Sequence, residues 1–436
     1  MNAIDKAPGH RRKRLCAATL AALAALGSMD VGAADTGLPR QIAVKLLSGG
    51  SLPAVLSTYS LTLDKRLGPR PMYLLRTTGA DDVNAKIVAL RADPRVAFAE
   101  PNFRLRDPEA RKRSVWAIGS AADYQAQWAP QQLGLERAHR ETTGQGVKVA
   151  VIDTGVDYAH PALAGRLLPG IDYVDNDNDP SERGDPSQLA FGHGTHVAGI
   201  VALAAPGATI LPLRVLDPQG RGNIWAVAEA LLYAADPDGN PGTPDQAQVI
   251  NLSLGTTSPT KLLDKVVELV TCSDDDDDED EDDDSDPGFD GDRERCNVQH
   301  GSVVVAAAGN GGSSGEVQYP AGERAEGALA VAASTKGSRI ASFSNRGPWV
   351  QIAGPGVGIT SAVPGGGYGV WSGTSMATPL VAGIAALAKA ENPDWKPVDV
   401  TKRLTDRSVR LCDTALRRVD ARGAVFDEAP SGPSCP

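Results

Sequence analysis

The sequence predicts an α/β protein with a mainly parallel sheet flanked by helices, preceded by a small α+β module. Apolar runs rich in β-branched residues supply the strands, and runs with helical spacing lie between them. The strand runs are 147–152, 210–216, 248–254 and 302–308, and the helical runs are 195–204, 224–235, 261–270 and 374–390. Continuous apolar strands that alternate with helices are typical of a parallel sheet that is covered on both faces.

The module before this domain covers about residues 40–106. Residues 41–47 alternate as a strand, and residues 72–76 and 96–99 are predicted to form two further strands. Residues 81–90 have helical spacing, with Asp81 or Asp82 as the cap. Basic residues cluster after this module, between positions 104 and 113, and predict an exposed, cleavable stretch.

The N-terminus has the order of a secretory signal peptide. Basic residues at 11–14 precede an apolar run at 15–29, and small residues follow at 31–34. We therefore expect residues 1–34 to be removed on export, which predicts a secreted or periplasmic protein. The apolar run is too short for a mature membrane span, and no later run is long enough, so we expect no stable membrane insertion.

Cysteine usage agrees with export. Of the five cysteines, Cys16 leaves with the signal peptide and four remain. An even number in an exported chain favours disulfides. We expect Cys272 to pair with Cys296 and Cys412 with Cys435, because each pair brackets its own local loop. Zinc ligation is the alternative, but no two of these four cysteines stand at short ligand spacing.

Most of the net charge of −11 comes from one tract, residues 274–286, which holds 12 acidic side chains. The remaining composition, with 42% hydrophobic and 22% charged residues, excludes a coiled coil, a collagen and a wholly disordered chain. The tract lies within an acidic insertion, 272–296, which we expect to be a solvated loop closed at its base by the first disulfide. Binding of calcium or of a basic partner there is the sharper alternative.

Three segments carry residues suited to nucleophilic catalysis. Asp153 follows an apolar strand, His193 lies in Gly192-His193-Gly194-Thr195-His196, and Ser375 opens a helix in Ser372-Gly373-Thr374-Ser375-Met376-Ala377. Each has a plainer interpretation: a strand-end Asp or a helix-opening Ser can be a simple cap. His193 and His196 could also bind a metal, but no Glu stands beside them as in a zinc hydrolase helix.

Asp153, His193 and Ser375, in this chain order, resemble the subtilisin-like serine proteases (subtilases, peptidase family S8). The resemblance covers about residues 128–425 and implies a doubly wound, subtilisin-like fold. It also implies that Ser375 is the nucleophile, that His193 is its general base and that Asp153 orients His193. The serine lacks the G-x-S-x-G context of α/β-hydrolases. Sedolisins share Gly-Thr-Ser but use Glu in place of His, so His193 argues against them.

The resemblance assigns further contacts. Asn310, after the strand at 303–308, matches the side-chain donor to the oxyanion, together with the Ser375 backbone N–H. Subtilases bind extended peptide between two backbone segments, an edge-strand mode of recognition. The matching segments are Gly220, Arg221 and Gly222, and Ser253, Leu254 and Gly255, with Gln318 at the floor of the main specificity pocket.

No cofactor is expected for the chemistry, but structural calcium is possible. Ala162 replaces a calcium-ligating Asp that many subtilases carry after the His-Pro pair, which puts that site in doubt. Clustered oxygen ligands occur in two other loops. These are Asp175, Asp177 and Asp179 in the first loop, and Asp236, Asp238 and Asn240 in the second. Such loops are also good turns.

Residues 35–113 resemble a subtilase propeptide of the ferredoxin-like α+β type, an inhibitor and folding chaperone, most clearly in Arg95-Val96-Ala97-Phe98-Ala99-Glu100-Pro101-Asn102. We expect a self-processing zymogen, cut between about 103 and 123, with a peptidase domain at 114–436. The expected partners are protein or peptide substrates and the chain's own propeptide, with no nucleic acid and a monomeric enzyme. The alternatives are a catalytically silent binding scaffold and a serine esterase.

Overall fold

The structure is a computed structural model that describes residues 37–79, 82–106, 117–240, 243–272, 301–429 and 435. The predicted signal peptide, the acidic tract and Cys296 lie outside the described residues. None of the described helices has both the length and the apolar character that a membrane crossing requires.

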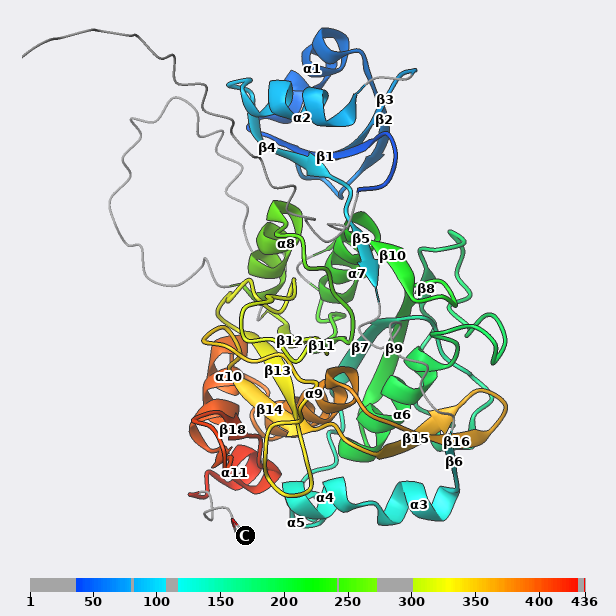
Figure 1. Cartoon of the computed structure of the whole chain (residues 1–436), viewed down its shortest axis with the longest axis vertical. Helices are drawn as coiled ribbons and strands as arrows, with labels where there is room; N and C mark the ends of the chain where they lie inside the picture. Colours follow the sequence, from blue (N-terminus) through cyan, green and yellow to red (C-terminus); the bar gives the residue numbers. More distant parts are fainter. Residues whose placement is uncertain are drawn as a thin grey trace, which may run out of the picture. The chain divides into compact units, whose positions relative to one another are not determined.

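The N-terminal module is a four-stranded antiparallel sheet with two helices (Figure 1). Its elements in chain order are β1 (Gln41–Leu46), α1 (Leu52–Tyr59), β2 (Leu61–Arg66), β3 (Met72–Thr77), α2 (Val83–Arg91) and β4 (Val96–Pro101). The strand order β2-β3-β1-β4 is the ferredoxin-like arrangement that was predicted. Asp82 caps α2, because its side chain accepts hydrogen bonds from the backbone N–H groups of Asn84 and Ala85.

The two faces of this small sheet pack against different partners. Ile42, Val44 and Leu46 share a core with Val55 of α1 and with α2. The alternate residue, Ala43, belongs to the larger core that contains helices of the main domain. The period of two in β1 therefore gives the module a core of its own and a second apolar face that packs on the main domain.

The main domain is built on a nine-stranded sheet in the order β17-β18-β14-β13-β12-β11-β7-β9-β8, and all neighbouring pairs are parallel except β17 with β18. Its strands are β7 (Lys148–Asp153), β8 (Ile171–Asp172), β9 (Thr209–Arg214), β11 (Val249–Leu252), β12 (Val303–Ala307), β13 (Ala328–Ser334), β14 (Ile352–Pro355), β17 (Val409–Arg410) and β18 (Arg417–Arg418). In the sheet, β9 pairs with one edge of β7, and β11, which comes later in the chain, pairs with the other edge. The strand order therefore reverses between β7 and β11, where α/β proteins place their sites.

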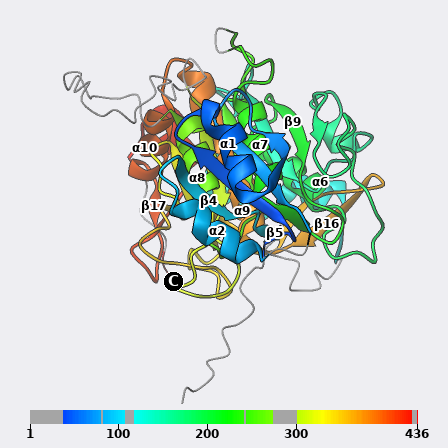
Figure 2. The ribbon, with the colours of Figure 1, turned by 90° about the horizontal axis from the view of Figure 1, so that it is seen from above.

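Helices cover both faces of this sheet (Figures 1 and 2). Val149 and Val151 pack with α6 (His193–Ala204) and α9 (Thr374–Glu391), whereas Ala150 and Ile152 pack with α7 (Ile224–Ala235) and α8 (Lys261–Thr271). Alternate residues of one strand thus enter two separate cores, which explains why β7 is apolar from Val149 to Ile152.

Smaller elements complete the domain. A hairpin of β15 (Ile359–Val363) and β16 (Gly367–Trp371) pairs with β6 (Ala117–Gly119). The other helices are α3 (Ala121–Ala126), α4 (Trp128–Leu133), α5 (Leu135–Ala138), α10 (Pro397–Asp406) and α11 (Ala421–Phe426). The predicted Cys412–Cys435 disulfide is present. Cys272 is also disulfide-bonded, but its predicted partner lies outside the described part of the chain.

Candidate active site

The predicted acid lies at the end of β7, beside the point where the strand order reverses. Asp153 is the last residue of β7 and is 1% exposed. Its Oδ1 accepts a hydrogen bond of 2.7 Å from the backbone N–H of Thr154. The buried carboxylate is therefore held by the backbone of its own strand end.

The predicted base lies at the N-terminus of α6. His193 is fully buried, and its Nδ1 lies 2.7 Å from Asp153 Oδ1. A carboxylate at this distance favours the tautomer with the proton on Nδ1, which leaves Nε2 able to accept a proton. The structure therefore brings these two predicted residues together in the geometry that a general base requires.

Glycine at position 194 makes this approach possible. A Cβ added to Gly194 would lie 2.1 Å from the carbonyl oxygen of Gly155 and 3.2 Å from the Cβ of Asp153. The Gly155 oxygen belongs to the backbone and cannot move out of the way like a flexible side chain. The glycine after His193 is therefore required by the close contact between the first turn of α6 and the loop after Asp153.

The predicted nucleophile is the second residue of α9. Ser375 is fully buried, and its Oγ lies 3.2 Å from the carbonyl oxygen of Ser253. The Ser253 hydroxyl in turn donates to the carbonyl oxygen of Ser375 at 3.1 Å. These reciprocal contacts join the start of α9 to the segment after β11, so the serine is fixed to one wall of the predicted substrate cleft.

The predicted oxyanion donor is held against the residue that precedes this serine. Asn310 Oδ1 accepts hydrogen bonds from Thr374 N at 2.9 Å and from Thr374 Oγ1 at 3.1 Å. An amide carries its oxygen and its NH2 group on opposite sides, so fixing the oxygen also fixes the direction of the NH2 group. Thr374 was not assigned a role from the sequence, although its place in Gly-Thr-Ser is the signal that could have indicated one.

Trp371 is a second residue that the sequence did not indicate. Its ring stacks on His196, with centroids 4.6 Å apart and planes 6° apart, and lies 5.9 Å from the ring of His193. His196 Nε2 lies 3.1 Å from the carbonyl oxygen of Gly369. The two histidines thus have separate polar partners, which argues against the metal alternative, and the Trp371 ring packs against both imidazoles.

The two predicted substrate-binding segments are bridged by the chain's own N-terminal region. The strand β5 (Arg104–Arg106) pairs antiparallel with β10 (Arg221–Asn223). On its other side, Arg106 N donates to Gly255 O at 3.1 Å and Gly255 N donates to Arg106 O at 3.2 Å. An extended peptide of this chain therefore already lies between the Gly220–Gly222 and Ser253–Gly255 segments as an added β-strand.

Gln318 lies next to this cleft and is 8% exposed. A Cβ on Gly255 would lie 2.7 Å from its side chain, and a Cβ on Gly309 would lie 2.9 Å from its amide oxygen. Gln318 therefore sits between the wall that carries Gly255 and the turn that leads to Asn310. This packing depends on glycines at both contacts, and the role of Gln318 at the floor of a specificity pocket stays a prediction.

The N-terminal module also caps two helices of the main domain. Glu100 is 3% exposed and accepts hydrogen bonds at the start of α8 from Thr260 Oγ1 at 2.7 Å and from the backbone N–H groups of Lys261 and Leu262, both at 2.9 Å. Asn102 Oδ1 accepts one from Trp225 N, at the start of α7, at 3.1 Å. The module thus supplies acceptors to helix N-termini that lack enough of their own.

The first predicted calcium loop does not gather its carboxylates. Asp175 Oδ2 accepts from Arg214 Nη1 at 2.6 Å, Asp177 accepts from the backbone N–H of Asp179, and Asp179 accepts from Ser181 and Arg183. Each carboxylate is used by a local turn or an ion pair. This local bonding is why the three predicted ligands do not converge.

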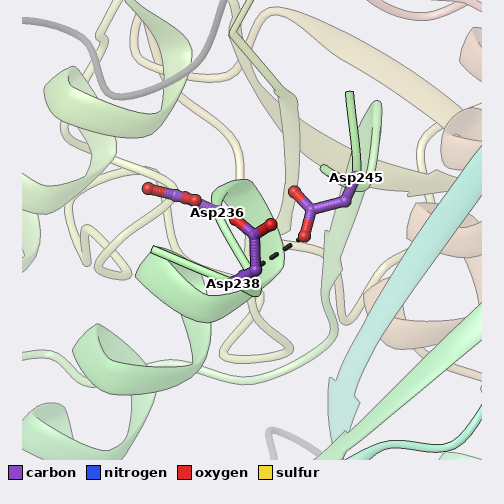
Figure 3. A group of neighbouring side chains, drawn as sticks. All are labelled: Asp236, Asp238 and Asp245. Atoms are coloured by element: carbon purple, nitrogen blue, oxygen red, sulfur yellow. Dashed lines mark hydrogen bonds between the residues drawn. The ribbon is translucent and has the colours of Figure 1, made fainter. Parts of the chain in front are cut away.

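Among the described residues, carboxylates converge instead in the second loop, at Asp236, Asp238 and Asp245 (Figure 3). One oxygen from each lies within 4.8 Å of the others. Asp236 Oδ1 and Asp245 Oδ1 are shielded from solvent and accept no hydrogen bond within the described ranges. Burial and the neighbouring Asp245 and Asp238 raise the pKa of Asp236. Oxygen ligands of this kind fit calcium, although three acids alone do not define a site.

Comparison with known proteins agrees with this geometry. Residues 144–423 match the subtilase family (peptidase S8), and residues 35–102 match the fervidolysin N-terminal prodomain. The thermophilic serine proteinase of Bacillus sp. strain AK1 is 38% identical over 321 residues, which cover 71% of this chain and 67% of that protein. Subtilisin BL of Lederbergia lenta is 37% identical over 300 residues, covering 66% of this chain and 93% of that protein.

Solved structures show the same fold. Fervidolysin from Fervidobacterium pennivorans, described as a keratinolytic enzyme related to subtilisin, superposes with a TM-score of 0.68 at 23% identity, covering 91% of this chain and 62% of that chain. A protease from Pseudoalteromonas arctica superposes with a TM-score of 0.57 at 28% identity, covering 71% of this chain and 99% of that chain. The chain therefore belongs to the subtilase family and is a subtilisin-like serine protease with an N-terminal prodomain.

Proposed function

We propose that this chain is the zymogen of an exported serine endopeptidase, in which Ser375, His193 and Asp153 hydrolyse peptide bonds through an acyl-enzyme. Ser375 Oγ attacks the scissile carbonyl while His193 Nε2 accepts its proton. His193 then returns the proton to the leaving amine, and Asp153 stabilises the charged imidazole. A water molecule repeats the sequence on the acyl-enzyme, which releases the second product.

The oxyanion that forms in each step requires hydrogen-bond donors that are already in place. We assign these donors as the Asn310 amide and the backbone N–H of Ser375. Support for Asn310 comes from its rigid attachment to Thr374, since a donor that needs no reorganisation stabilises developing charge most effectively. The Ser375 N–H lies in the first turn of α9, where helix N–H groups have no intrahelical acceptor.

The observation that best supports endopeptidase activity is the backbone pairing of β5. Residues 104–106 form an antiparallel strand with β10 on one side and bond to Gly255 on the other. A substrate held in this way is recognised mainly through its backbone and must be extended on both sides of the reacting bond. This mode suits a protein or peptide chain and does not suit a small ester.

We propose that the prodomain, placed at residues 35–113, inhibits the enzyme until it is removed. The strand β5 fills the cleft that a substrate would use, and Glu100 and Asn102 anchor the prodomain to α8 and α7. The prosegment carries 14 basic and 8 acidic side chains, whereas the chain as a whole is acidic. Opposite charge favours association of the two parts, less strongly in salt.

The test compares the full chain with its Ser375→Ala variant in an exporting host. We expect the wild type to lose its prodomain and digest casein, and the variant to keep its prodomain and digest nothing. Ser372→Ala is the matched control, because Ser372 precedes the nucleophile by three residues and its Oγ accepts a hydrogen bond from the Gly358 backbone in a solvent-exposed contact. A Ser375→Ala protein that still matures and digests casein would show that the mechanism is wrong.

A further inference from the structure

A second acidic residue, Glu182, lies beside the Asp153–His193 pair and has no role in the chemistry described above. It belongs to the loop between β8 and α6. Its backbone N–H donates to the carbonyl oxygen of Val156 at 3.0 Å, and Val156 N donates to Pro180 O at 3.0 Å. This loop therefore runs alongside the segment that follows Asp153.

The carboxylate of Glu182 contacts the first turn of the helix that carries His193. Its Oε2 accepts from Thr195 Oγ1 at 2.9 Å and from Thr195 N at 3.3 Å. Gly192, at the N-cap of α6, has no side chain and makes no capping hydrogen bond. Glu182 therefore supplies from outside the helix the acceptor that the N-cap residue lacks, and its negative charge suits this end of α6.

Thr195 and Thr154 link the same turn to the Asp153 segment. The Thr195 hydroxyl accepts from Asp157 N at 3.0 Å while it donates to Glu182. In the other direction, Gly194 N donates to Thr154 Oγ1 at 2.8 Å, and Thr154 N donates to Asp153 Oδ1. Glu182 is thus the final acceptor of hydrogen bonds that join two segments: residues 153–157, which contain Asp153, and the first turn of α6, which contains His193.

The environment of Glu182 also couples it electrically to this pair. Its Oε1 is inaccessible to solvent. Burial raises the pKa of Glu182 to about 7; contacts with Thr154 and Thr195 oppose this rise, and the nearby Asp153 carboxylate adds to it. The adjacent Arg183 is ion-paired with Asp179 at 2.7 Å. Asp153 is therefore the charged residue that acts on the Glu182 carboxylate, and it belongs to the Asp153–His193 pair.

We propose that Glu182 is a positioning residue for the reaction: it holds the first turn of α6, and with it His193, against the Asp153 segment. This proposal rests on the catalytic roles proposed above for Asp153 and His193. Removing the carboxylate frees the Thr195 N–H and hydroxyl, so the imidazole can rotate or shift relative to Asp153. Small displacements of a reacting group reduce turnover more than they reduce substrate binding.

The test uses Glu182→Ala and Glu182→Gln in the full chain, with kcat and KM measured on a peptide substrate after maturation and active-site titration. We expect Glu182→Ala to lower kcat about 10-fold with KM changed less than about 2-fold. Glu182→Gln keeps an acceptor oxygen for Thr195 and should recover kcat to within about 3-fold of wild type. Glu136→Gln is the control, since Glu136 is exposed on α5 and forms a surface ion pair with Arg140.

A pH profile separates positioning from plain helix capping. Below pH 7 Glu182 is itself mostly protonated, so its charge favours the protonated imidazole only over the upper part of the acidic limb. Removing the carboxylate should move that part of the kcat/KM profile to slightly lower pH in both variants. If Glu182→Ala lowers Tm but leaves kcat and the acidic limb at wild-type values, Glu182 is only a structural cap and the proposal is wrong. Wild-type values for all three quantities also overturn it. Ser375→Ala, assayed in parallel, reports separately on the proposed mechanism.

Discussion

Loss of the Glu100 carboxylate should weaken the prodomain as an inhibitor. Its two oxygens serve three donors at the start of α8, from Thr260, Lys261 and Leu262. Replacing an acceptor at a helix N-terminus costs about 0.5–2 kcal/mol, and a buried donor left unsatisfied costs about 1–3 kcal/mol. Burial raises the pKa of Glu100, so the cost of desolvating the carboxylate offsets part of the stabilisation that these hydrogen bonds provide.

For Glu100→Ala, a net loss of about 2 kcal/mol corresponds to a dissociation constant for the cleaved prodomain that is about 30-fold higher. Glu100→Gln keeps one acceptor oxygen and should show a smaller increase. The assay dilutes freshly processed full-length protein and measures activity per titrated active site against total concentration. The concentration at which half of the activity is released should rise about 30-fold in Glu100→Ala.

Asp64→Ala is the control, because Asp64 lies on the exposed face of β2 and pairs with Arg76 within the prodomain. Its midpoint should stay within about 2-fold of wild type, as expected for loss of a surface ion pair. A Glu100→Ala midpoint that also stays within about 2-fold would refute the reasoning that this cap holds the prodomain in place. Titration of active sites keeps a lower folding yield from being mistaken for weaker inhibition.

Three further changes test other parts of the structure. Asn310→Ala should lower kcat about 10²–10³-fold with little change in KM, the scale for one lost oxyanion donor; unchanged kcat would remove Asn310 from the mechanism. Burial, with the neighbouring Asp264 next, raises the pKa of Glu323 to about 9, and Glu100 of the prodomain adds to this effect. Glu323 is neutral below this pKa and does not repel Glu100, but its ionisation above about pH 9 places a second negative charge near Glu100. Inhibition should therefore weaken as pH rises through about 9, and Glu323→Gln should remove this dependence in the dilution assay. If calcium binds the Asp236 cluster, calcium at 100 times its dissociation constant adds about 2.7 kcal/mol to the free energy of unfolding and raises Tm. Asp238→Asn should abolish this rise in Tm, and in chelator its Tm should be slightly above that of the wild type. Equal responses to calcium in both proteins would exclude the site.

Much of the main domain could be predicted from the sequence because its signals are local. The strand β7 is apolar from Val149 to Ile152, since it is buried on both faces, and the helices α6, α7, α8 and α9 lie where helical spacing predicted them. Other elements lacked such a signal. The sequence of β2 is mostly exposed and shows little apolar alternation, and β13 is rich in alanine, which favours helix as readily as strand.

The sequence alone was enough to predict Asp153, His193 and Ser375 as the catalytic residues, because each lies in a short motif. The structure shows why two of the motif neighbours matter: Gly194 permits a close approach to Gly155, and Thr374 bonds to Asn310. The tertiary structure decided what joins segments that are far apart in the chain. It placed residues 104–106 between β10 and Gly255, and it brought Glu182 to the first turn of α6. It also paired Asp175 with Arg214, so that Asp175 does not join other carboxylates in a metal site. These contacts depend on how loops fold across the sheet, and no local periodicity or spacing records which distant donor a carboxylate will meet.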